Sequence, residues 1–136
     1  MEAPSAAELQ NDPTVRAAFA AAWADSFPDD PLLRHEEGGF IYYNPTAKTL
    51  TIRRTRPGRT SELDLSSPPV VQDCYLVGIY HKHPTLIGFM PDPSIDDHKL
   101  ADEAGIPFFT ISEEQTYVIG PDRRIGGCTG PTGYPI

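Results

Sequence analysis

Two histidines one residue apart, His81 and His83, end an apolar run and precede Pro84. Side chains at positions i and i+2 of a β-strand point to the same face, so both imidazoles would face one point at the end of the strand. Neutral imidazole nitrogens bind zinc at about 2.0–2.1 Å, so such a pair can share one ion. Because the same spacing also arises by chance or on a plain surface, a zinc site needs further ligands.

An aspartate further along the chain is the candidate third ligand. Ser94 has the character of a helix N-cap, and Asp97 would then lie in the first turn, where the positive end of the helix keeps a carboxylate ionised. A plain capping interaction is the alternative interpretation. Two histidines and a carboxylate leave the fourth tetrahedral position to water, which is typical of a catalytic zinc site.

Two glutamates are candidates for a base beside such a water. Glu36 and Glu37 stand directly before Gly38-Gly39 and a run of strand-forming residues. A charged pair before a strand is ordinarily just solvated, so the role of each depends on what it faces. The two remaining histidines are interpreted as non-ligands, His35 as a loop residue and His98 as a helix residue that points away from the site.

A helix and a hairpin are predicted to come before the histidines. Asp12-Pro13 joins an N-cap residue to the proline favoured in a first helical turn. The helix that begins there has one apolar face, made by Val15, Phe19 and Trp23. Residues 39–43 and 50–52 are rich in strand formers and are predicted to form a hairpin around Asn44-Pro45.

The strand that leads to the histidines is expected in the middle of the sheet. Residues 74–80 are apolar on both parities, as in a strand covered on both faces. Simple alternation puts Tyr75, Val77 and Ile79 on one face and Leu76 and Tyr80 on the other.

Further elements are predicted on either side of that strand. A second helix is expected over residues 94–105, and two more strands over 108–112 and 117–119. The polar, turn-rich connection after the hairpin is predicted to contain one short edge strand around Leu63 and Leu65. This order of elements is that of an α+β protein.

Length and composition indicate one folded domain. A chain of 136 residues, 39% hydrophobic and 10% aromatic, can bury one core and is too small for two. We expect a flexible leader over residues 1–12, a catalytic domain over 13–125 and a tail rich in glycine and proline over 126–136.

The charge balance and the apolar runs exclude several classes of function. A net charge of −8 opposes nucleic-acid binding, and the four arginines from Arg53 to Arg59 are interpreted as a solvated hairpin end. No apolar run reaches the roughly 18–20 residues that span a bilayer, and the start lacks the pattern of a Sec signal. We therefore expect no membrane partner and a cytoplasmic location, with non-Sec secretion left open. Cys74 and Cys128 lack the spacing of a zinc knuckle or a disulfide framework.

Taken together, these motifs resemble the JAB/MPN (JAMM motif) family of zinc metalloproteases. The family pattern is a glutamate two residues before a glycine-led strand, H-x-H-P after an apolar strand, and S-x-x-D at the start of a helix. The three parts occur in that order within residues 36–42, 77–84 and 93–97, and the resemblance covers residues 36–120. It implies a cytidine-deaminase-like JAB/MPN fold, in which a central mixed sheet is flanked by an N-terminal helix and by a helix after the H-x-H strand.

The resemblance also implies a set of site residues. The family holds Zn²⁺ on two histidines and an aspartate, which correspond to His81, His83 and Asp97. Its general acid/base corresponds to Glu36, and the serine that helps to hold the developing oxyanion corresponds to Ser94. The implied activity is hydrolysis of a peptide or isopeptide bond by a metal-activated water.

The implied substrate is a protein or peptide, such as a ubiquitin-like protein or a partner in a toxin system. Ten residues separate His83 from Ser94, a longer loop than in the eukaryotic deubiquitinating members. It is similar to that of a bacterial branch that includes modules of toxin and secretion-system proteins. Apolar residues in the loop 85–92 are predicted to line the substrate groove. Alternative functions are an effector or toxin module and a non-catalytic MPN-type binding scaffold, and Glu37 is the alternative to Glu36 as the base.

Overall fold

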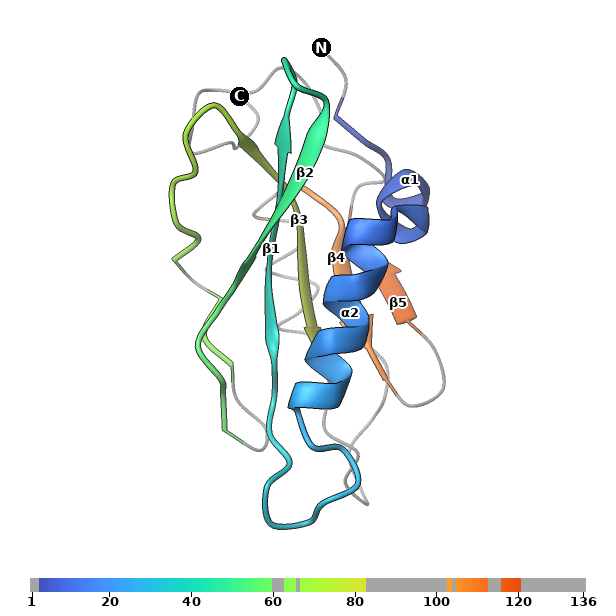
Figure 1. Cartoon of the computed structure of the whole chain (residues 1–136), viewed down its shortest axis with the longest axis vertical. Coiled ribbons are helices and arrows are strands. Elements are labelled where there is room, and N and C mark those ends of the chain that lie inside the picture. Colours follow the sequence, from blue (N-terminus) through green and yellow to red (C-terminus); the bar gives the residue numbers. More distant parts are fainter. Residues whose placement is uncertain are drawn as a thin grey trace.

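A five-stranded sheet is the centre of the fold, with the strand order β2-β1-β3-β4-β5 (Figure 1). The computed structural model describes residues 3–59, 63–65, 67–82, 103, 105–112 and 116–120. Within these residues the strands are β1 (Gly38–Asn44), β2 (Thr49–Arg54), β3 (Tyr75–Lys82), β4 (Phe108–Ile111) and β5 (Thr116–Ile119). β3 and β4 run parallel and the other neighbouring strands run antiparallel, so the sheet is mixed. Two helices, α1 (Ala6–Asn11) and α2 (Pro13–Asp25), precede it, and the predicted α+β class is confirmed.

The N-terminal segment contains a helix that we did not predict. α1 begins at Ser5, whose hydroxyl accepts a hydrogen bond from the Glu8 backbone N–H at 3.1 Å. The Glu8 carboxylate in turn accepts one from the Ser5 backbone N–H at 3.2 Å. This reciprocal capping box satisfies two of the amides that a helix start leaves open.

The expectation of a flexible leader over residues 1–12 is therefore wrong for residues 3–12. Leu9 is fully buried and packs over Gly78 of β3, where an added Cβ would lie 3.4 Å from the Leu9 Cδ1 atom. A helix of six residues is too short to be stable alone, so burial of Leu9 and its neighbours holds α1 in place.

The second helix begins where the sequence predicts it. The Asp12 carboxylate accepts hydrogen bonds from the backbone N–H groups of Thr14 at 2.8 Å and Val15 at 3.3 Å. Phe19 lies between Tyr80 and Phe109, with ring centroids 5.2 and 5.3 Å away. The predicted apolar face of α2 is thus confirmed as the face that packs on the sheet.

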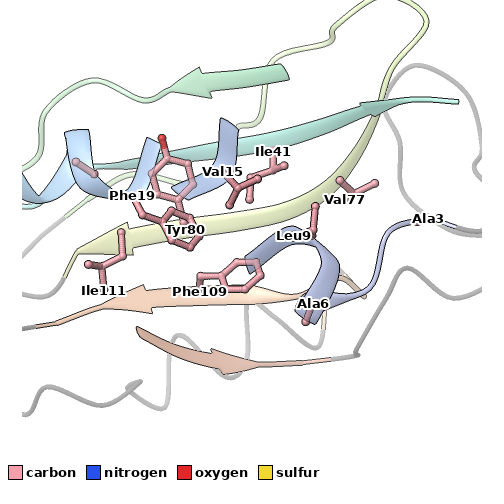
Figure 2. Packing of buried hydrophobic residues seen from close by; sticks show 11 residues of the cluster. Ala3, Ala6, Leu9, Val15, Phe19, Ile41, Val77, Tyr80, Phe109 and Ile111 are labelled. Carbon is pink, nitrogen blue, oxygen red and sulfur yellow. The ribbon is translucent and has the colours of Figure 1, made fainter. Parts of the chain in front are cut away.

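The two faces of the sheet bury separate clusters. One cluster lies under the helices (Figure 2) and includes Leu9, Val15, Phe19, Ile41, Val77, Tyr80, Phe109 and Ile111. The other lies on the opposite face and includes Phe40, Tyr42, Leu65, Leu76, Ile79, Ile106 and Phe108. Leu65 belongs to this second core, but residues 63–65 form no strand. The predicted edge strand around Leu63 and Leu65 is therefore wrong.

β3 is the central strand, as predicted, but it contains a bulge. Ile41 of β1 pairs with Gly78, and the next residue, Tyr42, pairs with Leu76. Val77 is therefore an extra residue on β3, which shifts the alternation of side chains by one position.

The bulge corrects the predicted faces of β3. Val77 lies in the same cluster as Tyr80 under the helices, and Leu76 lies in the same cluster as Ile79 on the other face. Strict alternation of side chains along β3 would have put Val77 and Tyr80 on opposite faces, and likewise Leu76 and Ile79. After the bulge the alternation is regular, so His81 follows Ile79 onto the face away from the helices.

Several further predictions can be compared with the structure. The hairpin of β1 and β2 and the antiparallel pair of β4 and β5 are confirmed. Of the predicted second helix, Glu103 is helical and Gly105 has a φ of 67°, as expected for a C′ residue. The start of that helix, the loop 85–92 and the tail 126–136 lie outside the described residues. In the part of the chain that is described, no helix combines the length and apolar character needed to cross a membrane.

Candidate active site

The candidate site lies where the end of β3 meets the start of β1, at the lower end of the sheet in Figure 1. Gly38 lies opposite His81 in the antiparallel register. One step further, the Lys82 backbone N–H donates to the Glu37 carbonyl oxygen at 2.8 Å. The pairing brings the two glutamates to the end of the strand that carries the first histidine.

A second stretch of chain holds Glu36 from its other side. The Glu36 backbone N–H donates to the Arg59 carbonyl oxygen at 2.8 Å, and the Gly58 N–H donates to the Glu36 carbonyl oxygen at 2.9 Å. The Glu36 side chain is buried. Its carboxylate therefore projects from a fixed backbone.

His81 faces that carboxylate. The His81 Nδ1 atom lies 3.5 Å from the Glu36 Oε1 atom, and Nε2 lies 3.2 Å from the Thr110 Oγ1 atom of β4. The Phe108 ring meets the imidazole edge-on at 4.9 Å between centroids. An imidazole fixed on one side and a buried carboxylate on the other form a pair that can bind a cation or move a proton.

The glycines at the start of β1 permit this close approach. A Cβ on Gly38 would overlap the Tyr80 carbonyl oxygen and would lie 2.8 Å from a methyl carbon of Leu63. A Cβ on Gly39 would lie 2.5 Å from the Arg53 carbonyl oxygen. Side chains at these positions would force β1 away from its neighbours and carry Glu36 away from His81.

Glu37 points to the opposite face and is held by two cationic or polar partners. Its Oε1 atom lies 2.6 Å from the Arg54 Nη2 atom, and its Oε2 atom lies 2.5 Å from the His35 Nε2 atom. Arg54 also reaches Asp25 at the end of α2, at 2.8 Å. Burial lowers the pKa of Arg54, but the bonds to Asp25 and Glu37 outweigh it, so the net shift is upward.

Two buried polar groups lie on the same face as Glu37. The Lys82 Nζ atom has no hydrogen-bond partner among the described residues and lies 5.3 Å from the centre of the Trp23 ring. Burial lowers the pKa of Lys82, and the charge of Glu36 partly opposes that shift. The Tyr80 hydroxyl likewise lacks a partner in the described part of the chain, and burial raises the pKa of Tyr80 to about 12.

The structure brings together two of the five predicted site residues. Glu36 and His81 converge, whereas His83, Ser94 and Asp97 lie outside the described residues. Across the described ranges, no three His, Cys, Asp or Glu side chains gather closely enough to hold a metal ion.

Sequence reasoning missed Thr110 as a neighbour of His81 and Arg54 as a partner of Glu37. Thr110 could have been singled out, because it is the one polar residue in an otherwise apolar strand, β4. Arg54 gives no such signal, because it is one of four clustered arginines, which we interpreted together as a solvated hairpin end. Its contacts with Glu37 and Asp25 correct that interpretation for this residue.

The chain matches no known protein-family model, and no curated protein or solved structure resembles it closely enough to count as a match. Its function must therefore be inferred from its own residues and their geometry.

Proposed function

We propose that this chain is a zinc-dependent hydrolase of peptide or isopeptide bonds, of the JAB/MPN type, with Glu36 as its general acid/base. One observation carries the proposal: the buried carboxylate of Glu36 lies 3.5 Å from the imidazole of His81 at the carboxyl end of the central strand. His81 opens the H-x-H-P motif, and Glu36 stands two residues before the glycine-led strand. Spacing in the sequence and proximity in space thus select the same two residues.

His81, His83 and Asp97 are the residues that would hold the zinc. Histidines that bind a metal ordinarily engage their second ring nitrogen with a protein oxygen, and Thr110 offers such an oxygen to the Nε2 atom of His81. The Nδ1 atom, on the side of Glu36, would then face the metal. The contacts of His81 therefore fit a ligand. When bound, zinc supplies Lewis acidity that polarises the scissile carbonyl and lowers the pKa of a water from ~15.7 towards ~7.

Glu36 performs the proton transfers in this proposal. Its carboxylate accepts a proton from the attacking water and returns it to the leaving amine, so the residue ends the cycle as it began. The backbone hydrogen bonds to Gly58 and Arg59 fix the main chain of Glu36, which lowers the entropy lost in bringing its carboxylate to the reactive geometry. Ser94 is proposed to donate a hydrogen bond to the oxyanion that develops on the carbonyl.

The zinc content of the purified chain tests the proposal directly. We expect about one zinc per chain in the wild type and its loss in His81→Ala, since a three-ligand site rarely survives the loss of one ligand. His35→Ala is the matched control, because this histidine lies on the other side of the Glu36-Glu37 pair and should leave the zinc in place. Elemental analysis that finds no zinc in the wild type, or full zinc in His81→Ala, would contradict the assignment.

A metal-free MPN-type scaffold is distinguished by the same measurement. A scaffold would contain no zinc and would bind its partner equally well after His81→Ala. If the chain binds zinc but hydrolyses no peptide or isopeptide substrate, the proposed metal site would stand and the proposed activity would be wrong.

A further inference from the structure

The loop between α2 and β1 exposes large apolar side chains. Leu32 is 92% exposed, Leu33 55% and Phe27 50%. Single exposed leucines are common on soluble proteins, but apolar side chains gathered on one loop are typical of a binding surface. This loop is the lowest part of the molecule in Figure 1.

Part of this loop lines a hollow that is open to solvent. The hollow has a volume of about 710 Å³, and its apolar walls come from Trp23, Phe27 and Leu32, with Pro28 and Pro31 between them. Among the described residues the lining also includes Asp29 and Asp30 and no lysine or arginine, and the nearby Lys82 ammonium lies over the Trp23 ring, 5.3 Å from its centre. The hollow therefore joins apolar walls to a negatively charged edge.

The loop has a defined conformation. The Asp30 carboxylate accepts hydrogen bonds from the backbone N–H groups of Leu32 at 2.8 Å and Leu33 at 3.2 Å. The Arg34 N–H donates to the Asp30 carbonyl oxygen at 3.0 Å. These bonds hold the two leucines outward, so their exposure belongs to the folded structure.

The backbone of the same loop is strained at Phe27. Its φ of 50° lies in the left-handed region, which aromatic residues rarely adopt and which glycine or asparagine tolerates better. Strained positions are maintained where the surrounding structure determines them, and they cluster at binding and catalytic sites. Here the strained residue is also a half-exposed aromatic wall of the hollow.

We propose that this hollow binds a polypeptide segment that presents an aliphatic side chain beside lysine or arginine. The aliphatic group would cover Trp23, Phe27 and Leu32, and the cation would face Asp29 and Asp30. The same carboxylates, together with the net charge of −8, repel anionic lipid surfaces and nucleic acids. This binding requires no zinc, so it stands or fails separately from the proposed hydrolase.

The position of the hollow relates it to the candidate site. The loop continues into His35, whose Nε2 atom lies 2.5 Å from the Oε2 atom of Glu37, the neighbour of Glu36, and the His35 ring lies 6.2 Å from the Phe27 ring. A segment bound in the hollow would therefore lie at the same end of the sheet as Glu36 and His81.

A labelled peptide tests the proposal with the full chain. The probe is a fluorescein-labelled octapeptide of alternating leucine and arginine, measured by fluorescence anisotropy. Two comparison peptides of the same length carry glutamate in place of arginine, or serine in place of leucine. We expect the leucine-arginine peptide to bind at least tenfold more tightly than either. Equal binding of the serine-arginine peptide would show general attraction to an acidic protein and would overturn the proposal.

Variants of the loop locate the binding. Leu32→Ser should weaken binding at least tenfold without changing the melting temperature, because this side chain makes little contact in the folded chain. Phe27→Asn should weaken binding too, while asparagine keeps the left-handed backbone. Val70→Ser is the matched control, since Val70 is 63% exposed on a different loop and should not affect binding.

Two outcomes of the variants would reject the inference. Binding that is unchanged in Leu32→Ser would place the peptide elsewhere on the chain. If sedimentation showed that the wild type dimerises and that Leu32→Ser is monomeric, a second copy of the chain would be the occupant.

Discussion

Glu36 and Glu37 are identical in type and adjacent in sequence, yet they lie on opposite faces of the sheet in different surroundings. Glu37 is bound at 2.6 Å by Arg54 and at 2.5 Å by His35, so both of its oxygens are engaged. Glu36 faces His81 at 3.5 Å, a distance longer than a good hydrogen bond. A carboxylate with both oxygens tied contributes to structure, whereas one that is held but incompletely paired can still exchange a proton.

The charges around the two glutamates differ in the same way. On the Glu37 face, Arg54 forms ion pairs both with Glu37, just before β1, and with Asp25, at the end of α2. On the Glu36 face, the described neighbours are an imidazole, the hydroxyl of Thr110 and apolar side chains. The charge of Glu36 also acts on a described cation, Lys82, which lies on the other face. The comparison predicts that substitutions on one face affect activity and those on the other affect stability.

The largest expected effect is that of Glu36→Gln on hydrolysis. The amide keeps the shape of the side chain and removes the base, so turnover should fall 10²- to 10⁴-fold while zinc stays bound. A fluorogenic peptide or isopeptide substrate that the wild type cleaves gives the rate, and elemental analysis gives the zinc content.

Glu37→Gln is the control for that variant. It should keep most of the hydrolytic rate and lose stability instead, because Arg54 and His35 lose the charge of their partner. If only Glu37→Gln lost activity, Glu37 would be the base. If Glu36→Gln kept activity with zinc bound, the proposed mechanism would be wrong.

Arg54→Met should have the next largest effect, on stability. It leaves the buried Glu37 carboxylate without its main counter-charge, and we expect a loss of about 2–3 kcal/mol in the free energy of unfolding, since part of Arg54 is exposed. Chemical denaturation measures it. Arg53→Met, a change at the exposed neighbour on β2, should stay within about 0.5 kcal/mol of the wild type. Similar losses in both variants would show that these ion pairs do not stabilise the fold.

Thr110→Val tests the fixation of His81 on the Glu36 face. Removing the hydroxyl releases the Nε2 side of the ring, and loss of such a partner typically lowers metal affinity about 10- to 100-fold. Competition with a chromophoric chelator measures the affinity. Thr51→Val on β2 is the matched control and should leave zinc binding unchanged. If the wild type, Thr110→Val and Thr51→Val bound zinc with equal affinity, Thr110 would have no role in the metal site.

Tyr80→Phe should have the smallest effect at neutral pH, a gain of about 1 kcal/mol, because it removes a buried hydroxyl that lacks a partner in the described part of the chain. The pKa of Tyr80 is about 12 in the folded protein against 10.0 otherwise. Between pH 10 and 12 the unfolded chain loses this proton first, so the stability of the wild type falls as the pH rises. The advantage of Tyr80→Phe should therefore grow above pH 10. Parallel stability curves for the two proteins would contradict the shift.

Periodicity and turn chemistry predicted most of the larger elements. The cap at Asp12, the hairpin and the doubly buried strand all express local rules that do not depend on distant residues. α1 was missed although its capping box, Ser5 with Glu8, is visible in the sequence, because six residues have no measurable apolar period. The bulge at Val77 could not be predicted, because a strand that is apolar on both parities does not reveal a change of phase.

The site was predictable only in part, for a related reason. The choice of His81 and Glu36 follows from motif spacing, and their proximity follows from the register of β1 with β3. The different roles of Glu36 and Glu37 depend on the partners that each finds on its face of the sheet. The partner of Glu37, Arg54, lies 17 residues away along the chain. Such a pairing is determined by the register of β1 with β2, which no local pattern contains.

The docking of α1 determines when this protein can finish folding during its synthesis. Leu9 is synthesised 100 residues before Phe109, which belongs to the same buried cluster. At ribosomal speeds of about 5–20 residues per second, that interval is roughly 5–20 s. Throughout it, a helix too short to persist alone leaves its apolar residues uncovered on the nascent chain. α1 is therefore made well before its packing partner on β4, and it is a segment that chaperones would meet.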